Sequence, residues 1–403
     1  MHLPAPQFTG LKLLVIRSYP IFVICLATLF GSSLWFSVNA VADGLYAVWG
    51  ITTADMGHLT SVLQFGFISG TLFIALSGIA DRHSPSRIFL LSAIAGAIAN
   101  SLFPFSDGHL GLALLLRFIV GVTLAGIYPI AMKLVVNWAP GRTGNVLGWM
   151  VGMLALGSGA PHLIRGADLT SHWQGVLYVT SILAVIGGIL VFRLGDGVKN
   201  VQAQKIRGLD VISAFKIPAF RATAFGYFGH MWELYAFFSL IPVMLGLSTL
   251  IAGDQIYIVS FGVFFASAVG CVVGGLLTRR WGSGRVAIVA LAASGLICAI
   301  TPWLYSISEF SLVILLMLWG LFIAADSPQF SSLAARVCPP ERVGGALALM
   351  NCIGFGLTIF AIEIVSKLWE TWQMTVAWVL LPGPLIGLYA MRHMWRNDVL
   401  EQQ

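Results

Sequence analysis

The feature that most constrains this chain is a series of twelve long apolar runs. Each run has roughly the 20 residues that a helix needs to cross the hydrocarbon core of a bilayer. The runs are continuous rather than alternating with period two, which excludes a transmembrane β-barrel. The runs cover residues 20–42, 58–80, 87–105, 110–133, 143–164, 174–194, 221–245, 255–278, 286–306, 309–335, 343–366 and 373–391. The sequence therefore predicts an all-α polytopic membrane protein with twelve transmembrane helices.

Composition and charge support this class and predict the orientation. With 58% hydrophobic and only 9% charged residues among 403, the chain has too few polar groups to cover a soluble protein of this size. If the N-terminus is cytoplasmic, 19 of the 22 Lys and Arg residues fall in cytoplasmic segments, and the exceptions are Arg117, Arg165 and Lys367. No small-residue cleavage site precedes the first run, which we interpret as a retained helix. We expect a bacterial inner-membrane protein with both termini in the cytoplasm.

The two halves of the chain resemble each other at an offset near 197–200 residues. Trp35 corresponds to Trp232, and Pro129 corresponds to Pro328. Six spans in each half, in the same orientation, predict a parallel repeat whose halves pack face to face around a central cavity. The expected organisation is a six-helix half in residues 1–194, a cytoplasmic connection in residues 195–220 and a second six-helix half in residues 221–403.

Two loops at equivalent places in the repeat carry a family pattern. Residues 77–87 read S-G-I-A-D-R-H-S-P-S-R, and residues 275–285 read G-L-L-T-R-R-W-G-S-G-R. Both are similar to the G-x-L-x-D-R-x-G-x-x-R loop of the major facilitator superfamily. The first copy has Ser77 and Ser84 where glycine is usual, and the second has Arg279 in place of the acid. The resemblance implies the fold of that family and transport by alternating access.

The resemblance also implies a role for these loop charges. In the family, the acid of the first loop interacts with the start of span eleven and stabilises the outward-facing state. A carboxylate near a helix N-terminus is favoured by about 0.3–1 kcal/mol. We therefore expect Asp81 to act as a conformational latch, and the alternative is that the loop charges only set topology. The remaining members of this predicted latch are Arg82, Arg87, Arg279 and Arg285.

Two acids lie at membrane depth, Glu233 in span seven and Asp326 in span ten. A charge at that depth costs at least ~2.5–3.5 kcal/mol unless it faces protein, water or a partner. Their positions in the first half of the repeat are Phe36 and Ile127, so the scaffold itself does not require an acid. Because desolvation favours the protonated carboxyl, either acid could carry a coupling proton.

Each acid has a polar neighbour one turn away, His230 before Glu233 and Gln329 after Asp326. Pairing of the acids with Arg117, or of Glu233 with His230, is the structural alternative to a coupling role. Glu363, by contrast, is expected close to the outer end of span eleven, where it would simply face water.

Arg117 begins an R-x-x-x-G pattern in span four that resembles the family. There the resemblance implies proton coupling or anion binding, and the alternative is that the side chain extends to the membrane interface. Further polar and aromatic residues complete the predicted cavity, namely Trp35, Asn39, Gln64, Tyr128, Trp232 and Asn351. Span five carries a glycine-rich run that includes Gly148, Gly152 and Gly157, which favours close helix packing.

No nucleotide-binding loop, metal-ligand spacing or nucleophile motif occurs, and the five cysteines form no C-x-x-C pair. We therefore expect no cofactor, no metal, no nucleic-acid partner and no enzymatic activity. The prediction is a monomeric, proton-coupled secondary transporter of a small molecule, with import and export both open. The alternative function is a non-transporting membrane sensor or assembly partner.

Overall fold

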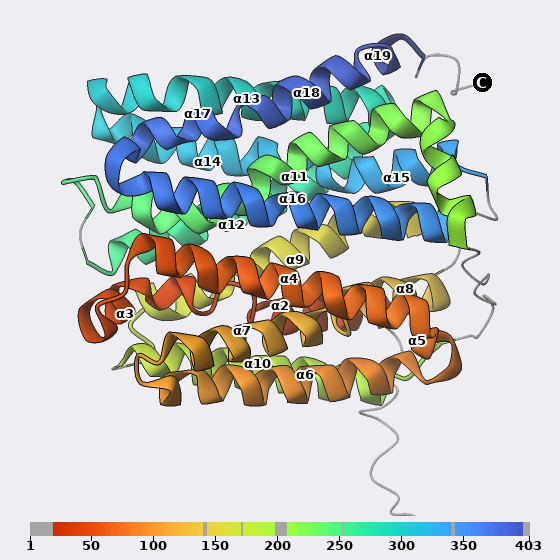
Figure 1. Cartoon of the computed structure of the whole chain (residues 1–403). Helices are drawn as coiled ribbons and strands as arrows, with labels where there is room; N and C mark the ends of the chain where they lie inside the picture. Colours follow the sequence, from red (N-terminus) through yellow and green to blue (C-terminus); the bar gives the residue numbers. More distant parts are fainter. Residues whose placement is uncertain are drawn as a thin grey trace, which may run out of the picture.

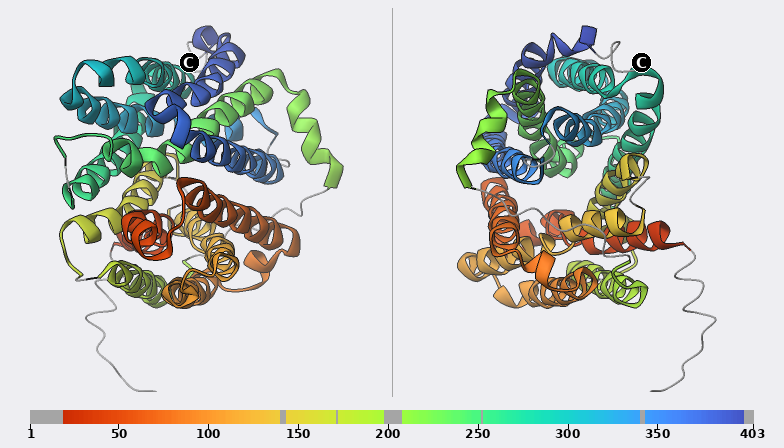
Figure 2. Two further views of the ribbon diagram at one scale, coloured as in Figure 1. Left: turned by 60° about the vertical axis from the view of Figure 1, so that its left-hand side comes forward. Right: turned by 90° about the vertical axis from the view of Figure 1, so that its right-hand side faces the viewer.

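The computed structural model describes residues 19–139, 143–170, 172–197, 208–251, 253–339 and 343–397, and within these the regular structure is helical. The long helices run side by side and form two bundles, the first half of the chain below and the second half above in Figure 1. The same two bundles are seen from other directions in Figure 2. Much of the predicted connection, residues 198–207, lies outside the described residues.

The first half holds a chain of α-helices and short 3-10 turns. They are α2 (Pro20–Ser32), η1 (Asn39–Val41), α3 (Ala42–Trp49), α4 (Thr53–Ser77), α5 (Ile79–Arg82), α6 (Pro85–Leu102), η2 (Phe103–Ser106), α7 (Leu110–Leu124), α8 (Tyr128–Trp138), α9 (Thr143–Gly166) and α10 (Trp173–Leu194).

The second half repeats this layout after the connection. Its elements are η3 (Gly208–Lys216), α11 (Pro218–Leu245), α12 (Gln255–Trp281), α13 (Ser283–Ile307), α14 (Glu309–Ala325), α15 (Ser327–Val337), α16 (Val343–Trp372), η4 (Gln373–Val376), α17 (Ala377–Leu380), α18 (Pro382–Met391) and α19 (Met394–Asn397).

The helices account for the twelve predicted spans. Ten stretches of the described chain are long and apolar enough to cross a membrane. One of them, Val343–Met391, has 49 residues. As one helix it would be about 74 Å long, more than twice the thickness of a bilayer core. It is instead divided at η4, where Gln373 has a positive φ of 45°. The short apolar helix α2, continued through residues 33–38 to η1, supplies the remaining span.

Three spans are interrupted near their middle. Span four breaks between α7 and α8 at residues 125–127, and span ten breaks between α14 and α15 at Asp326. Pro129 and Pro328 each lie in the first turn of the helix that follows, where a missing N–H leaves no hydrogen bond unmade. The equivalent positions of these breaks agree with the predicted repeat. Span one also breaks, over residues 33–38, between α2 and η1.

Glycines allow the closest helix contacts. A Cβ added at Gly121 of α7 would lie 2.1 Å from the carbonyl oxygen of Leu63 on α4. In the glycine run of span five, a Cβ at Gly148 would lie 3.0 Å from the carbonyl oxygen of Cys271 on α12, and one at Gly152 would lie 3.1 Å from that of Ala268. A Cβ at Gly157 would lie 2.3 Å from the carbonyl oxygen of Leu29, so span five packs closely both against α12 of the other half and against α2 of its own.

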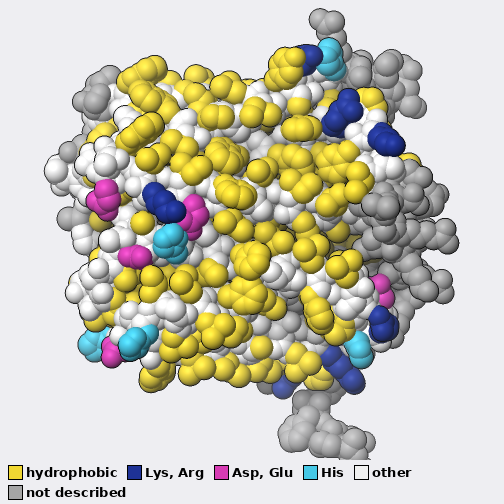
Figure 3. All heavy atoms as spheres, viewed as in Figure 1, with side chains coloured by type: hydrophobic (Ala, Val, Ile, Leu, Met, Phe, Trp, Pro, Cys, Tyr) yellow, Lys and Arg dark blue, Asp and Glu magenta, His cyan; other side chains and the backbone are white. Residues whose placement is uncertain are grey.

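Two ends of the molecule can be distinguished. The connector end holds α5 and η3, on the right in Figure 1, and the opposite end holds α3 and η4, on the left. On the face seen in Figure 3, hydrophobic side chains form a broad middle band, and charged side chains gather toward the two ends. This distribution is the one expected for helices whose middles face lipid and whose ends face water.

Candidate functional site

A cavity lies between the two halves. It encloses about 700 Å³ of empty space, including its open side, and residues of α8 and α9 face residues of α11, α12, α14, α15 and α16 across it. Its polar lining consists of uncharged hydrogen-bonding groups, namely Tyr128, Ser158, Tyr227, Tyr235, Ser327, Ser331 and Asn351. Of the residues predicted to form a cavity, Tyr128 and Asn351 line it.

Aromatic rings from both halves meet beside this cavity. In the first half they are Trp35, Phe36 and Phe67, and in the second half Tyr235, Phe238, Phe264 and Phe355. Trp35 stacks on Tyr235 with ring centroids 5.4 Å apart. We call these seven residues the aromatic layer. A smaller pocket, lined in part by Asn39, Thr60 and Ser239, lies nearer the opposite end. The aromatic layer therefore separates the central cavity from that end.

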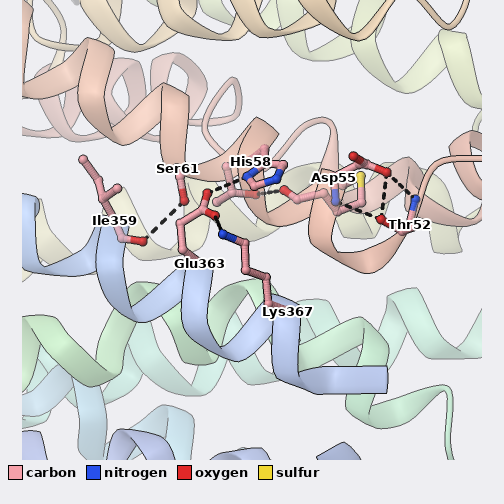
Figure 4. A network of polar contacts seen from close by, with 9 residues as sticks. Thr52, Asp55, His58, Ser61, Ile359, Glu363 and Lys367 are labelled. Carbon is pink, nitrogen blue, oxygen red and sulfur yellow. Dashed lines mark hydrogen bonds and ion pairs between the residues drawn. The ribbon is translucent and has the colours of Figure 1, made fainter. Parts of the chain in front are cut away.

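Polar contacts join the two halves at the opposite end. His58 Nδ1 on α4 lies 2.9 Å from Glu363 Oε1 on α16, and Lys367 Nζ lies 3.3 Å from Glu363 Oε2 (Figure 4). Ser61 Oγ donates to the carbonyl of Ile359 at 3.5 Å. The Glu363 side chain is only 22% exposed, so the expectation that it simply faces water is wrong. The charge instead ties α16 to α4.

A second group of contacts at this end involves Asp43 of α3. Arg165 Nη2 on α9 donates to Asp43 Oδ2 at 2.9 Å. Burial raises the pKa of the Asp43 carboxyl, but hydrogen bonds from Tyr257 of α12 and from Arg165 outweigh burial and leave the pKa below its usual value. Asp43 is therefore a charged acceptor at neutral pH, shared between α9 of the first half and α12 of the second.

Asp326 lies at the break of span ten and is fully buried. His230 Nδ1 lies 2.9 Å from its Oδ1, within ion-pair distance but without the alignment of a hydrogen bond. His230 Nε2 lies 3.1 Å from Ser327 Oγ, and Ser327 lines the cavity. His230 therefore connects a buried acid, whose oxygens accept no hydrogen bond among the described residues, to a hydroxyl at the cavity wall.

Glu233 is equally buried but differently surrounded. Trp319 Nε1 donates to Oε1 at 2.6 Å, and Ser294 Oγ donates to Oε2 at 3.0 Å. These partners lie on α14 and α13, so the carboxyl points into the bundle of the second half. The proposed pairing of His230 with Glu233 is not what the structure shows, because His230 pairs with Asp326.

Arg117 of α7 is 1% exposed, which excludes the alternative that its side chain extends to the membrane interface. Its guanidinium donates to the carbonyls of Leu34 at 3.2 Å and Trp35 at 2.6 Å, and to Ser37 Oγ at 3.3 Å. No acidic side chain in the described residues lies within ion-pair distance of Arg117. Arg117 thus binds backbone groups that the break in span one leaves free, rather than either membrane acid.

The remaining predicted cavity residues make local contacts. Gln329 Nε2 donates to the carbonyl of Ala325 at 3.3 Å, across the break of span ten. Asn39 Nδ2 donates to Thr60 Oγ1 at 3.0 Å. Trp232 Nε1 donates to a carbonyl of α17 at 3.0 Å, which directs this side chain toward span twelve.

The predicted latch residues lie at the connector end. Asp81 pairs with Lys133 Nζ of α8, within its own half, and Lys133 also binds the carbonyl of Ala80. Arg82 binds the carbonyl of Ser77, and Arg285 Nε donates to the carbonyl of Trp395 at 3.2 Å. The backbone N–H of Arg87 donates a hydrogen bond to Ser84 Oγ, and Arg279 is exposed near the end of α12. The latch function stays a prediction, and Lys133 is the partner that the sequence pattern did not indicate.

Comparison with known proteins gives a consistent assignment. The sequence profile of the Major Facilitator Superfamily matches residues 22–362. The chain is 21% identical to the probable sulfoacetate transporter SauU of Cupriavidus necator, over 90% of each chain. It is 22% identical to the niacin transporter NiaP of Acinetobacter baylyi, over 68% of this chain and 69% of that one.

Among solved structures, the nucleoside transporter NupG superposes with a TM-score of 0.73 at 14% identity, over 94% of this chain and 100% of that one. This likeness concerns the fold. Together with twelve spans arranged as two bundles around a central cavity, the match across residues 22–362 identifies the chain as a member of the Major Facilitator Superfamily.

Proposed function

We propose that this protein is a secondary active transporter that moves a small organic molecule by alternating access. The observation that carries the proposal is the central cavity, which is lined by both halves and shut off from the opposite end. Rocking of residues 1–194 against residues 221–403 would close the connector end and open the opposite end, and would expose the same lining to the other side of the membrane.

The connector end is proposed to face the cytoplasm of a bacterial cell, as the basic residues indicate. Closure of the opposite end by the aromatic layer is what an inward-facing state requires. Pairing of Asp81 with Lys133 inside one half suits this state, because the expected latch contact with span eleven belongs to the outward-facing one. The protein would act as a monomer, since each chain contains both halves and the cavity between them.

Asp326 is the proposed proton carrier. A fully buried carboxyl without hydrogen-bond donors favours its protonated form, and access to water favours the ionised form. Ser327 and His230 offer a short route between the cavity and Asp326, with distances of 3.1 Å and 2.9 Å. Glu233 is a poorer carrier, because Trp319 and Ser294 already bind both of its oxygens.

The substrate is proposed to be a small organic acid. Two relatives are named for sulfoacetate and niacin, and both of these molecules are compact acids. The cavity offers hydroxyl and amide groups together with aromatic rings, and none of its lining residues is acidic. Such a lining suits a small molecule with one polar group and an apolar or aromatic body.

The test is uptake into proteoliposomes that contain the purified full chain. Radiolabelled nicotinate and sulfoacetate serve as probes in counterflow, which needs no gradient, and in uptake driven by an imposed pH gradient. We expect counterflow of at least one probe, accumulation driven by the gradient in the wild type, and counterflow without accumulation in Asp326→Asn. Accumulation by Asp326→Asn at the wild-type level would contradict the assignment of the proton.

A further inference from the structure

Two buried groups in the first half have hydrogen-bonding atoms without partners. Gln64 of α4 is 0% exposed, and neither its amide oxygen nor its amide nitrogen has a hydrogen-bond partner in the described residues. Trp35, in the break of span one, is also 0% exposed, and its Nε1–H has no acceptor there. Leaving such groups unpaired is costly, and native proteins rarely keep them without a reason.

The two groups lie on facing segments. Thr60, one turn before Gln64, bonds to Asn39, and Phe67, one turn after Gln64, contacts the Trp35 ring with centroids 4.9 Å apart. Residues three and four apart share a helix face, so Gln64 is turned toward the same segment of span one that carries Trp35. The unpaired amide and the unpaired indole N–H therefore belong to one place in the fold.

This place is electrically positive. Arg117 holds the carbonyl of Trp35 with Nη2, and its own Nε has no hydrogen bond in the described residues. The guanidinium is 1% exposed and has no acidic partner within ion-pair distance among them. A buried cation without a counter-charge attracts an anion strongly, since little water screens it.

Rings from the second half cover this place in the present conformation. Tyr235 stacks on Trp35, and Phe355 lies 6.1 Å from it between centroids. Both covering residues also line the central cavity. Movement of the second half away from the first would therefore uncover the Trp35 indole and join this place to the cavity.

We propose that the Trp35 indole N–H and the Gln64 amide form a subsite for the carboxylate or sulfonate group of the substrate. Both groups can donate to an oxygen anion, and hydrogen bonds to charged acceptors are about twice as strong as neutral ones. The Arg117 charge behind Trp35 selects the anion over an uncharged analogue. This proposal rests on the proposed transport function, and it specifies which group of the substrate the first half of the chain binds.

The test measures thermal unfolding of the purified full chain with matched pairs of probes. Carboxylates from acetate to benzoate and sulfonates from methanesulfonate to benzenesulfonate are each compared with the corresponding primary amide. The variants are Gln64→Leu, which removes the amide with little change in side-chain volume, and Trp35→Phe, which removes the indole N–H and leaves a smaller ring. Asn137→Leu, near the C-terminal end of α8, loses one hydrogen bond to the Asp196 carbonyl and is the control.

We expect at least one acid to raise the unfolding temperature of the wild type while its amide does not. Gln64→Leu and Trp35→Phe should bind that acid about tenfold more weakly or worse, and Asn137→Leu should bind it normally. Without any probe, Gln64→Leu should unfold at or above the wild-type temperature, since it removes two unpaired polar atoms. A group that only supports the fold would lower it.

Three results would overturn the subsite: amides that bind as well as acids, no acid that shifts the wild type, or normal acid binding by Gln64→Leu. A drop in the unfolding temperature of probe-free Gln64→Leu, with acid selectivity kept, would assign these groups to a structural water instead. The transport proposal is tested separately by counterflow. Counterflow of an uncharged compound would support transport and contradict the subsite. Asp326→Asn should keep the acid-dependent shift even though it loses accumulation.

Discussion

Asp326 and Glu233 are both fully buried carboxyl groups, yet their neighbours give them different chemistry. Glu233 accepts one hydrogen bond on each oxygen. Asp326 accepts no well-aligned hydrogen bond in the described residues, and the imidazole Nδ1 of His230 lies 2.9 Å from its Oδ1. The sequence placed both acids at membrane depth, but depth alone could not separate them. The separation comes from Trp319 and Ser294, which bind Glu233, and from His230, which pairs with Asp326; these contacts form only when the helices pack.

Glu233 is therefore expected to stabilise the fold rather than to carry the coupling proton. Glu233→Gln keeps an acceptor for Trp319 and a partner for Ser294, and should accumulate substrate at close to the wild-type level. Glu233→Leu leaves the Trp319 N–H unpaired, which costs about 1–3 kcal/mol in the free energy of unfolding, whereas Ser294 can still donate to the carbonyl of Leu291. Thermal unfolding and gradient-driven uptake of both variants check this. Loss of accumulation in Glu233→Gln, with unchanged unfolding, would place the coupling proton on Glu233.

At the scale of the elements, the sequence predicted the spans well and their interruptions less well. Pro129 and Pro328, which correspond in the repeat, each follow directly on the break of their span. The break over residues 33–38 could not be foreseen, because that segment contains neither proline nor glycine. Its free carbonyls are bound by Arg117, a contact between spans that no local pattern encodes.

Local patterns also miss contacts between the halves. His58 and Glu363 are 305 residues apart in the sequence. From its local sequence, each is expected to lie at the end of a span and to face water. Only the packing of α4 against α16 makes them partners. The same limit applies to the cavity. The sequence indicated Tyr128 and Asn351 as lining residues, but it did not indicate Tyr227, Ser158 and Ser331.

Close helix packing gives a prediction at this scale. In Gly121→Ala the new Cβ would meet the carbonyl oxygen of Leu63, a backbone atom that cannot rotate away. We expect α4 and α7 to be forced apart, with a loss of about 1–3 kcal/mol in the free energy of unfolding. Gly111→Ala, on the same helix with nothing within 4 Å of its Cβ, is the control and should be neutral or slightly stabilising. Equal unfolding temperatures for both variants would contradict the packing shown.

At the scale of the whole molecule, the two ends are held differently. The opposite end is joined across the halves by His58 with Glu363 and by the aromatic layer beneath them. At the connector end, the loop acid Asp81 pairs within its own half. Alternating access requires that the contacts at the opposite end break and re-form in every cycle. Permanent closure of that end should therefore stop transport without unfolding the protein.

A cross-link between α4 and α16 tests this most directly. In the double variant His58→Cys with Glu363→Cys, a short bifunctional thiol reagent should join the two side chains, which face each other in Figure 4. We predict that the cross-linked protein loses counterflow and regains it when the link is cleaved, while His58→Cys alone and Glu363→Cys alone keep counterflow after the same treatment. Full counterflow by the fully cross-linked protein would contradict alternating access through this end.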